Sequence, residues 1–350
     1  MSFKNSTICL KFTTLLIFML ICLTGRSQYN FSTVDGFLQA NQKTFGNDLA
    51  AIVYKDDKII YQKVFGEEFN IKTRAPIAGS SQWLTAALVM TFVDEGKISL
   101  DEKVSNYLPI FETYGKTYIT IRQCLNQTTG ITDNSRSITK LLDKKKFESL
   151  EEEVNSFVKK EIAANPGNSF FYGTIGANIA GRVLEVISKK SFDALMKQRI
   201  FTPLEMKNSS FVPEDGSVNP SGGAESTAAD YINFLSMLLN KGMYKGKRIL
   251  SEKAITEMET IQAAKAEKKY VPKLTETYGY GLGTWIEEKD NGGNSTVISS
   301  PSFSGTLPYI DRCRNYACIL FIKKQLNDPP KELYGELKRR IDAQITSVCK

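Results

Sequence analysis

Ser80 and Ser81 are the residues whose hydroxyls could act as nucleophiles, because both stand at the start of an apolar helical run, Ser81–Glu95. A serine hydroxyl becomes a useful nucleophile only when a base lies within hydrogen-bond reach. One helical turn later the sequence has Trp83 and Leu84 instead of a base. Capping of the helix start is therefore the simpler role for both serines. Ser80 would act as a displaced nucleophile only if the fold brought a lysine to it.

The chain contains no histidine. This excludes a Ser-His-Asp triad, a Cys-His pair and any zinc site built on histidine, whatever the fold. Any catalysis would have to use Lys, Tyr, Asp or Glu side chains. We expect no metal and no cofactor.

The block Pro76–Phe111 resembles the active-site block of the serine β-lactamase and penicillin-binding-protein family, in its class C β-lactamase-related branch. That block carries Ser-x-x-Lys before an apolar helix, and the two matching positions are Gly79 and Gln82 here. Four further segments resemble the family in the correct order, namely Ile119–Ile131, Asn165–Met206, Gly222–Gly242 and Ser300–Leu320. The resemblance implies an α/β fold of the α+β type. An antiparallel sheet is built from both chain ends and flanked by helices, with a mostly helical domain inserted.

The same resemblance exposes departures at the catalytic positions. Gly79 has no side chain to form an acyl-enzyme, and the neutral amide of Gln82 cannot accept a proton. Tyr172 stands at the motif-two tyrosine, but a phenol without a nearby cation keeps a pKa of about 10 and is a poor base. Its simpler role is packing, with the hydroxyl bonded across the cleft.

Other family positions also differ. Gln127 and Thr129 stand where the family usually has His and Ser, and Thr174 replaces the usual Asn. The third motif, which carries Lys or His in relatives, falls near Ser300–Ser302 with neither cation present. Gly305 and Thr306 follow, where a strand bend or backbone hydrogen bonding to a ligand is expected.

We therefore predict an exported β-lactamase-related protein that is catalytically inactive or strongly impaired. Its cleft is expected to bind a peptidoglycan-type peptide or a small acyl ligand. The predicted lining residues are Ser80, Thr174, Ser300, Ser302, Gly305 and Thr306. Two alternatives stay open. One is an active serine hydrolase (esterase, D-amino-acid peptidase or β-lactamase) with a rearranged nucleophile, and the other is a structural or interaction protein whose cleft binds nothing.

Residues 1–27 have the pattern of an export signal. Lys4 and Lys11 precede the apolar run Phe12–Thr24, and small residues place a cleavage site before Gln28. The run is shorter than the ~20 residues that a transmembrane helix needs. A lipid anchor at Cys22 and an uncleaved anchor are alternatives. We expect a periplasmic or secreted protein. Cleavage would remove three basic residues and no acid, so the net charge of +7 would fall to +4, which is mild and predicts no nucleic-acid partner.

Four cysteines follow the signal: Cys124, Cys313, Cys318 and Cys349. They are too few and too scattered to form a disulfide framework. Cys124 lies among core-type positions and is expected to be buried. Cys313 and Cys318 flank a predicted hairpin turn and could pair in an oxidising compartment, which the sequence leaves open.

The elements expected to position these residues follow from hydrophobic periodicity. Helices are predicted at Thr33–Thr44, Ser81–Glu95, Leu150–Ala163, Ile175–Ser188, Phe192–Ile200, Thr227–Leu239 and Pro330–Ile345. Strands are predicted at Leu49–Tyr54, Ile59–Phe65, Tyr278–Ile286, Ser295–Ser300, Leu307–Asp311 and Tyr316–Ile322. We assign residues 28–75 and 271–350 to an α/β subdomain and residues 76–270 to a helical subdomain.

Overall fold

The computed structural model describes residues 29–132, 147–212, 217–302, 305–324, 326 and 331–349. The predicted export signal and Cys22 lie outside these residues. Within them, no helix is both long enough and apolar enough to cross a membrane.

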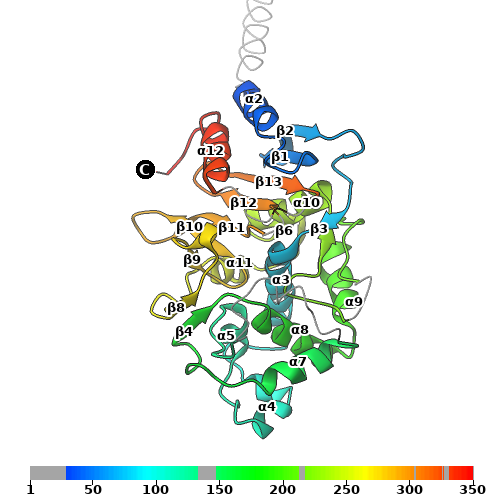
Figure 1. The fold of residues 1–350 in the computed structure, drawn as a ribbon, viewed down its shortest axis with the longest axis vertical. Coiled ribbons are helices and arrows are strands. Elements are labelled where there is room, and N and C mark those ends of the chain that lie inside the picture. Colours follow the sequence, from blue (N-terminus) through cyan, green and yellow to red (C-terminus); the bar gives the residue numbers. More distant parts are fainter. Residues whose placement is uncertain are drawn as a thin grey trace, which may run out of the picture.

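Seven strands form one antiparallel sheet in the order β2-β1-β13-β12-β11-β10-β9 (Figure 1). The strands are β1 (Leu49–Lys55), β2 (Lys58–Phe65), β9 (Gly279–Tyr280), β10 (Trp285–Lys289), β11 (Ser295–Ser299), β12 (Leu307–Asp311) and β13 (Tyr316–Ile322). Strand β1 pairs with β13, from Leu49 opposite Ile322 to Lys55 opposite Tyr316. The prediction of a sheet built from both chain ends is confirmed.

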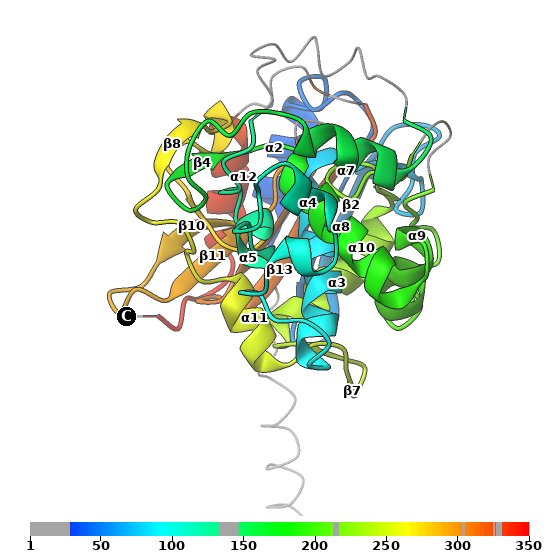
Figure 2. The same ribbon diagram turned by 90° about the horizontal axis from the view of Figure 1, so that it is seen from below.

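Helices cover both faces of the sheet. Helices α2 (Ser32–Ala40) and α12 (Lys331–Asp342) pack together on one face. The other face is covered by α3 (Ser81–Asp94), α10 (Ala228–Leu239) and the helices beyond them (Figure 2). These further helices are α4 (Ile110–Thr113), α5 (Ile121–Leu125), α7 (Leu150–Val158), α8 (Ile175–Ser188), α9 (Phe192–Met196) and α11 (Glu252–Met258). A π-helical turn, Lys197–Phe201, continues α9. The division into two subdomains stays a prediction.

Three small sheets complete the fold. They pair β3 (Ala75–Pro76) with β5 (Glu225–Ser226), β4 (Ser169–Phe171) with β8 (Glu267–Tyr270), and β6 (Met243–Tyr244) with β7 (Lys247–Arg248). The β4–β8 pair is parallel and lies beside the candidate site described below.

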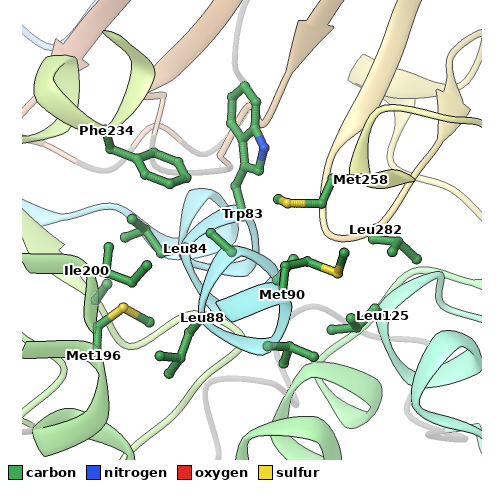
Figure 3. Close-up of a cluster of buried hydrophobic side chains, with 14 of the residues drawn as sticks. Trp83, Leu84, Leu88, Met90, Leu125, Met196, Ile200, Phe234, Met258 and Leu282 are labelled. Carbon is green, nitrogen blue, oxygen red and sulfur yellow. The ribbon is translucent and has the colours of Figure 1, made fainter. Parts of the chain in front are cut away.

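Helix α3 is the central element of the molecule. Every side chain from Ser81 to Phe92 is buried, as the apolar character of the helix on every side predicts. Figure 3 shows Trp83, Leu84, Leu88 and Met90 projecting around the helix toward other helices and loops. Gly96, at φ 66°, follows the helix end in the left-handed conformation that glycine adopts readily, and so ends the helix.

One strand prediction is wrong. The run Tyr278–Ile286 forms two antiparallel strands, β9 and β10, rather than one. Gly283 adopts φ +71°, and a β-carbon there would lie 2.5 Å from the carbonyl oxygen of Gln82. The chain therefore turns at this glycine because only a residue without a side chain fits against α3.

The disulfide also differs from the Cys313–Cys318 pairing that the sequence left open. Cys313 is bonded to Cys349, and Cys318 is a free, buried thiol. Cys318 lies on β13, and its side chain packs in the apolar layer under α2 and α12. The tail after α12 returns to the β12–β13 turn, where the Val348 amide donates to the Cys313 carbonyl at 2.7 Å. Cys124 is buried, as predicted.

Candidate ligand site at the start of helix α3

Gly79 lies in a short 3₁₀ turn, Ala78–Ser80, that leads into α3. A β-carbon at Gly79 would lie 2.9 Å from the Tyr172 hydroxyl, 3.6 Å from the Pro301 carbonyl oxygen and 3.9 Å from the Ser302 Cα. None of these three nearest atoms belongs to a lysine. The fold thus brings the predicted positions Gly79, Tyr172 and Ser302 together, and the tyrosine hydroxyl occupies the space that a side chain at position 79 would enter.

Gln82 is held by a network of hydrogen bonds in place of an ion pair. Its Oε1 accepts from Gln127 Nε2 at 2.7 Å and from the Tyr280 hydroxyl at 3.1 Å. Its Nε2 donates to the Gly173 carbonyl at 3.2 Å, and the Gly173 amide donates back to Gln127 Oε1 at 3.1 Å. Both oxygens are therefore engaged, and the two amide side chains connect α3, the segment after α5, the segment after β4, and β9.

This network determines what the position can do chemically. Both Gln82 and Gln127 are buried, and each amide is neutral at every ordinary pH. Because its hydrogen bonds lock the amide in place, Gln82 can position neighbours but cannot accept a proton or supply a positive field. The sequence identified Gln82 and Gln127 as departures from the family, but it did not identify Tyr280 as a site residue. Tyr280 lies in a run of aromatic and glycine residues, and no feature of that run sets it apart from its neighbours.

Four aromatic side chains form one wall of the site: Phe170, Tyr172, Tyr280 and Trp285. The rings of Tyr280 and Trp285 are 4.6 Å apart, and those of Tyr172 and Trp285 are 5.2 Å apart. Burial raises the pKa of the Tyr172 phenol, and the pKa of Tyr280 is raised in the same way. The expectation that Tyr172 keeps its ordinary pKa is therefore wrong, because enclosure by aromatic rings disfavours the phenolate. The phenol is an even poorer base than predicted.

Ser80 and Ser81 are fully buried, and their hydroxyls are engaged with distant backbone. The Ser80 hydroxyl donates to the Ser300 carbonyl at 2.5 Å, and the Ser81 hydroxyl accepts from the Ala224 amide at 3.1 Å. Helix α3 has no side-chain cap. The helix-capping prediction is therefore wrong for both serines, which instead tie α3 to segments far away in the sequence.

The segment expected to carry the third motif forms a tight turn next to Gly79. Ser300 and Ser302 are buried, and the Ser302 amide donates to the Thr306 carbonyl at 2.9 Å. Gly305 adopts φ +95°, so it is a bend that glycine favours. The Thr306 hydroxyl accepts from the Ile322 amide at 3.3 Å. Thr174 is partly exposed and stands immediately before α8, where its side chain makes no capping hydrogen bond.

No group of three or more Cys, Asp or Glu side chains that could hold a metal ion occurs in the described ranges. Neutral amides, buried hydroxyls and aromatic rings therefore make up the surroundings of Gly79. This site offers neither a nucleophile at position 79 nor a base at position 82.

Comparison with known proteins agrees with the geometry of the fold. The family described as Beta-lactamase matches residues 42–342. Protein flp of Staphylococcus aureus (strain MW2) is 25% identical over 199 residues, which cover 54% of this chain and 39% of that protein. Penicillin-binding protein 4 of Amycolatopsis lactamdurans is 29% identical over 199 residues, covering 48% of this chain and 51% of that protein. The matched part of the chain thus spans about half or less of the length of these curated relatives.

Solved structures show the same architecture. A crystal structure from Bacteroides dorei DSM 17855, described as a beta-lactamase, superposes with a TM-score of 0.81 at 26% identity. It covers 90% of this chain and 99% of that one. The octameric penicillin-binding protein homologue from Pyrococcus abyssi has a TM-score of 0.71 at 20% identity, covering 90% of this chain and 79% of that one. The second likeness concerns the fold alone.

Proposed function

Because this chain belongs to the beta-lactamase family while its site lacks the side chains of covalent catalysis, we propose that it is a non-covalent ligand-binding member of that family. The hydrogen-bonded pair Gln82–Gln127 carries this proposal. If a lysine at this position had simply been lost, a cavity or an unpaired polar group would remain. Here the two buried amide side chains instead form hydrogen bonds with each other and with their neighbours.

Loss of the nucleophile supports the same proposal. Removing one catalytic nucleophile or base costs several orders of magnitude in rate. Neither neighbouring serine offers a replacement, since the hydroxyls of Ser80 and Ser81 are enclosed and bonded to backbone groups. The raised pKa of Tyr172 also makes this residue unsuitable as a general base near neutral pH.

The ligand class that we propose is a cell-wall-type peptide or a small acyl compound, bound in the cleft beside Gly79. Support comes from the fold and from relatives whose names mark them as penicillin-binding proteins. We also propose that the chain is exported. The Cys313–Cys349 disulfide supports this location, because disulfides persist mainly in oxidising compartments.

Covalent labelling tests the loss of chemistry. The purified protein is incubated with a fluorescent penicillin and, separately, with a fluorophosphonate probe, and labelling is followed by intact mass. We expect no stoichiometric adduct, while an active serine hydrolase run in parallel is labelled. An adduct that maps to Ser80 or Ser81 would support the rearranged hydrolase and contradict our proposal.

Thermal shift with purified muropeptides tests binding. A ligand that binds only the folded state raises the unfolding temperature in a concentration-dependent way. We expect this rise in the wild-type protein and its loss in Thr174→Arg, which introduces a bulky charge at the start of α8. The matched control is Thr113→Arg on α4, an exposed position at the far end of the helical layer. Absence of any shift with the wild-type protein would favour the structural role.

A further inference from the structure

A second pocket lies on the opposite face of the sheet from α3, under helix α12. It has a volume of about 130 Å³. Its lining includes apolar residues such as Leu274, Pro301 and Leu307. The other lining side chains are aromatic (Tyr278, Tyr309, Tyr334), acidic (Glu287) and basic (Lys331, Lys338). Pockets for drug-sized ligands have volumes of about 300–1,000 Å³. The occupant of this smaller pocket must therefore have only a few non-hydrogen atoms.

Glu287 contributes a partly buried carboxylate to the pocket wall. It forms no ion pair with any described residue, although buried charges are normally paired. Burial raises the pKa of this carboxyl group, an effect opposed in part by a hydrogen bond from Ser299, by the charge of Lys338 and by a hydrogen bond from Tyr278.

Lys338 cannot serve as the partner of a ligand because acids already surround it. Its ammonium lies 2.7 Å from Asp342, 3.2 Å from Asp311 and 3.7 Å from Glu288. Lys331 differs. It lines the same pocket two helical turns earlier on α12 and forms no ion pair among the residues described. The pocket thus holds one carboxylate and one ammonium, Glu287 and Lys331, that form no ion pair among the described residues.

Two of the three tyrosines, Tyr309 and Tyr334, form walls rather than additional polar contacts. The Tyr334 hydroxyl donates to the Gly305 carbonyl at 2.7 Å, and the Tyr309 hydroxyl accepts from Tyr316 at 3.2 Å. With these hydroxyls engaged, the rings of Tyr309 and Tyr334 present apolar and π surfaces to the interior. Such surfaces suit a small ammonium group or a short alkyl side chain.

We propose that this pocket binds a small free α-amino acid, with the ligand ammonium at Glu287 and the ligand carboxylate at Lys331. A zwitterion supplies both missing charges in one small molecule, whereas a simple anion or cation would leave one wall charge unpaired. The pocket adjoins the surroundings of Gly79 through Pro301, which lines the pocket and whose carbonyl oxygen would lie 3.6 Å from a β-carbon at Gly79, but the charged groups of the proposal, Glu287 and Lys331, belong to the pocket alone.

Isothermal titration of the folded chain with glycine, L-alanine and D-alanine tests the proposal, with methylamine and acetate as singly charged probes. We expect saturable binding of at least one amino acid and markedly weaker binding of both singly charged probes. Removing one charged partner weakens binding by about tenfold or more. Glu287→Gln and Lys331→Met are each expected to show this loss, whereas Glu332→Gln and Lys324→Met, outside the pocket, keep the wild-type affinity.

Three results would overturn the proposal: no saturable binding of any amino acid, binding of methylamine or acetate as tight as that of the amino acids, or unchanged affinity in both pocket variants. Circular dichroism and urea unfolding establish that each variant is folded. If Glu287→Gln does not fold, Lys331→Met decides alone, because Lys331 is partly exposed at the start of α12 and its loss leaves the core intact.

Discussion

The hydroxyl of Tyr172 lies 2.9 Å from the point where a β-carbon on Gly79 would stand. Real β-carbons almost never approach a neighbour so closely, so the absence of a side chain at position 79 and the placement of the tyrosine depend on each other. The backbone at position 79 is thus packed against the Tyr172 side chain.

Gly79→Ala is therefore expected to destabilise the fold. Overpacking of this kind costs about 1–3 kcal/mol of the free energy of unfolding, measured by urea denaturation. The matched background is Tyr172→Phe, which removes the oxygen that the new methyl group meets. In that background Gly79→Ala should cost clearly less, and the difference is the coupling energy of the pair. Equal costs in both backgrounds would show that the close approach has no energetic consequence.

Disruption of the amide network provides a second prediction. Gln127→Leu leaves Gln82 Oε1 with one donor fewer and the Gly173 amide without its acceptor. An unsatisfied buried group costs about 1–3 kcal/mol. Gln39→Leu, at an exposed position on α2, is the control and should change the free energy of unfolding by less than about 0.5 kcal/mol. A cost for Gln127→Leu as small as that of the control would argue against a tightly bonded network.

Much of the fold can be predicted from the sequence because its signals are local. The apolar character of Ser81–Glu95 on every side predicts a buried central helix, and alternating or continuous apolar runs predict five of the seven main strands, with β9 and β10 merged into one. What failed depends on partners far away in the chain. Ser80 and Ser81 bond to Ser300 and Ala224 rather than to their own helix. Cys313 pairs with Cys349 because the chain returns after α12, which no spacing rule indicates.

The sequence predicts which positions of the candidate site differ from the family, but it does not predict the hydrogen bonds that the substituted residues make. Family resemblance marked Gly79, Gln82 and Gln127 individually. Their sequence positions do not show that Gln82 and Gln127 bond to each other, nor that Tyr280 donates to the same oxygen, because hydrogen-bond partners of buried amides are set by tertiary packing.

Restoring the missing groups tests whether the rest of the cleft is intact. The double change Gly79→Ser with Gln82→Lys introduces a hydroxyl near the Tyr172 oxygen and a cation one turn later on α3. A nearby ammonium lowers the pKa of a phenol, so Tyr172 should become a better base. We expect slow hydrolysis of a p-nitrophenyl ester above the wild-type background, with each single change inactive. If the folded double variant remains inactive, the surrounding site has lost more than these two side chains.

The disulfide between Cys313 and Cys349 should contribute to stability. It closes a loop across a sequence separation of 36 residues, and such bonds typically stabilise by about 2–4 kcal/mol. Cys313→Ala with Cys349→Ala is expected to lower the free energy of unfolding by this amount. Ser347→Ala, in the same tail, serves as the control. If mild reduction leaves the unfolding midpoint of the wild-type protein unchanged, the bond makes no contribution in solution.

The stability of the folded protein at alkaline pH should depend on Tyr54. Burial, together with Asp57, raises the pKa of this phenol to about 12 in the folded protein, against about 10 in an unfolded chain. Between these values the unfolded chain releases the proton while the folded chain keeps it, so stability falls as pH rises from about 10 to 12. The contribution is complete below about pH 10. Urea midpoints measured from pH 8 to 11.5 should therefore fall less steeply in Tyr54→Phe than in the wild-type protein. Tyr114→Phe, at an exposed position, should follow the wild-type slope. Identical slopes for all three proteins would mean that the Tyr54 phenol titrates alike in the folded and unfolded states.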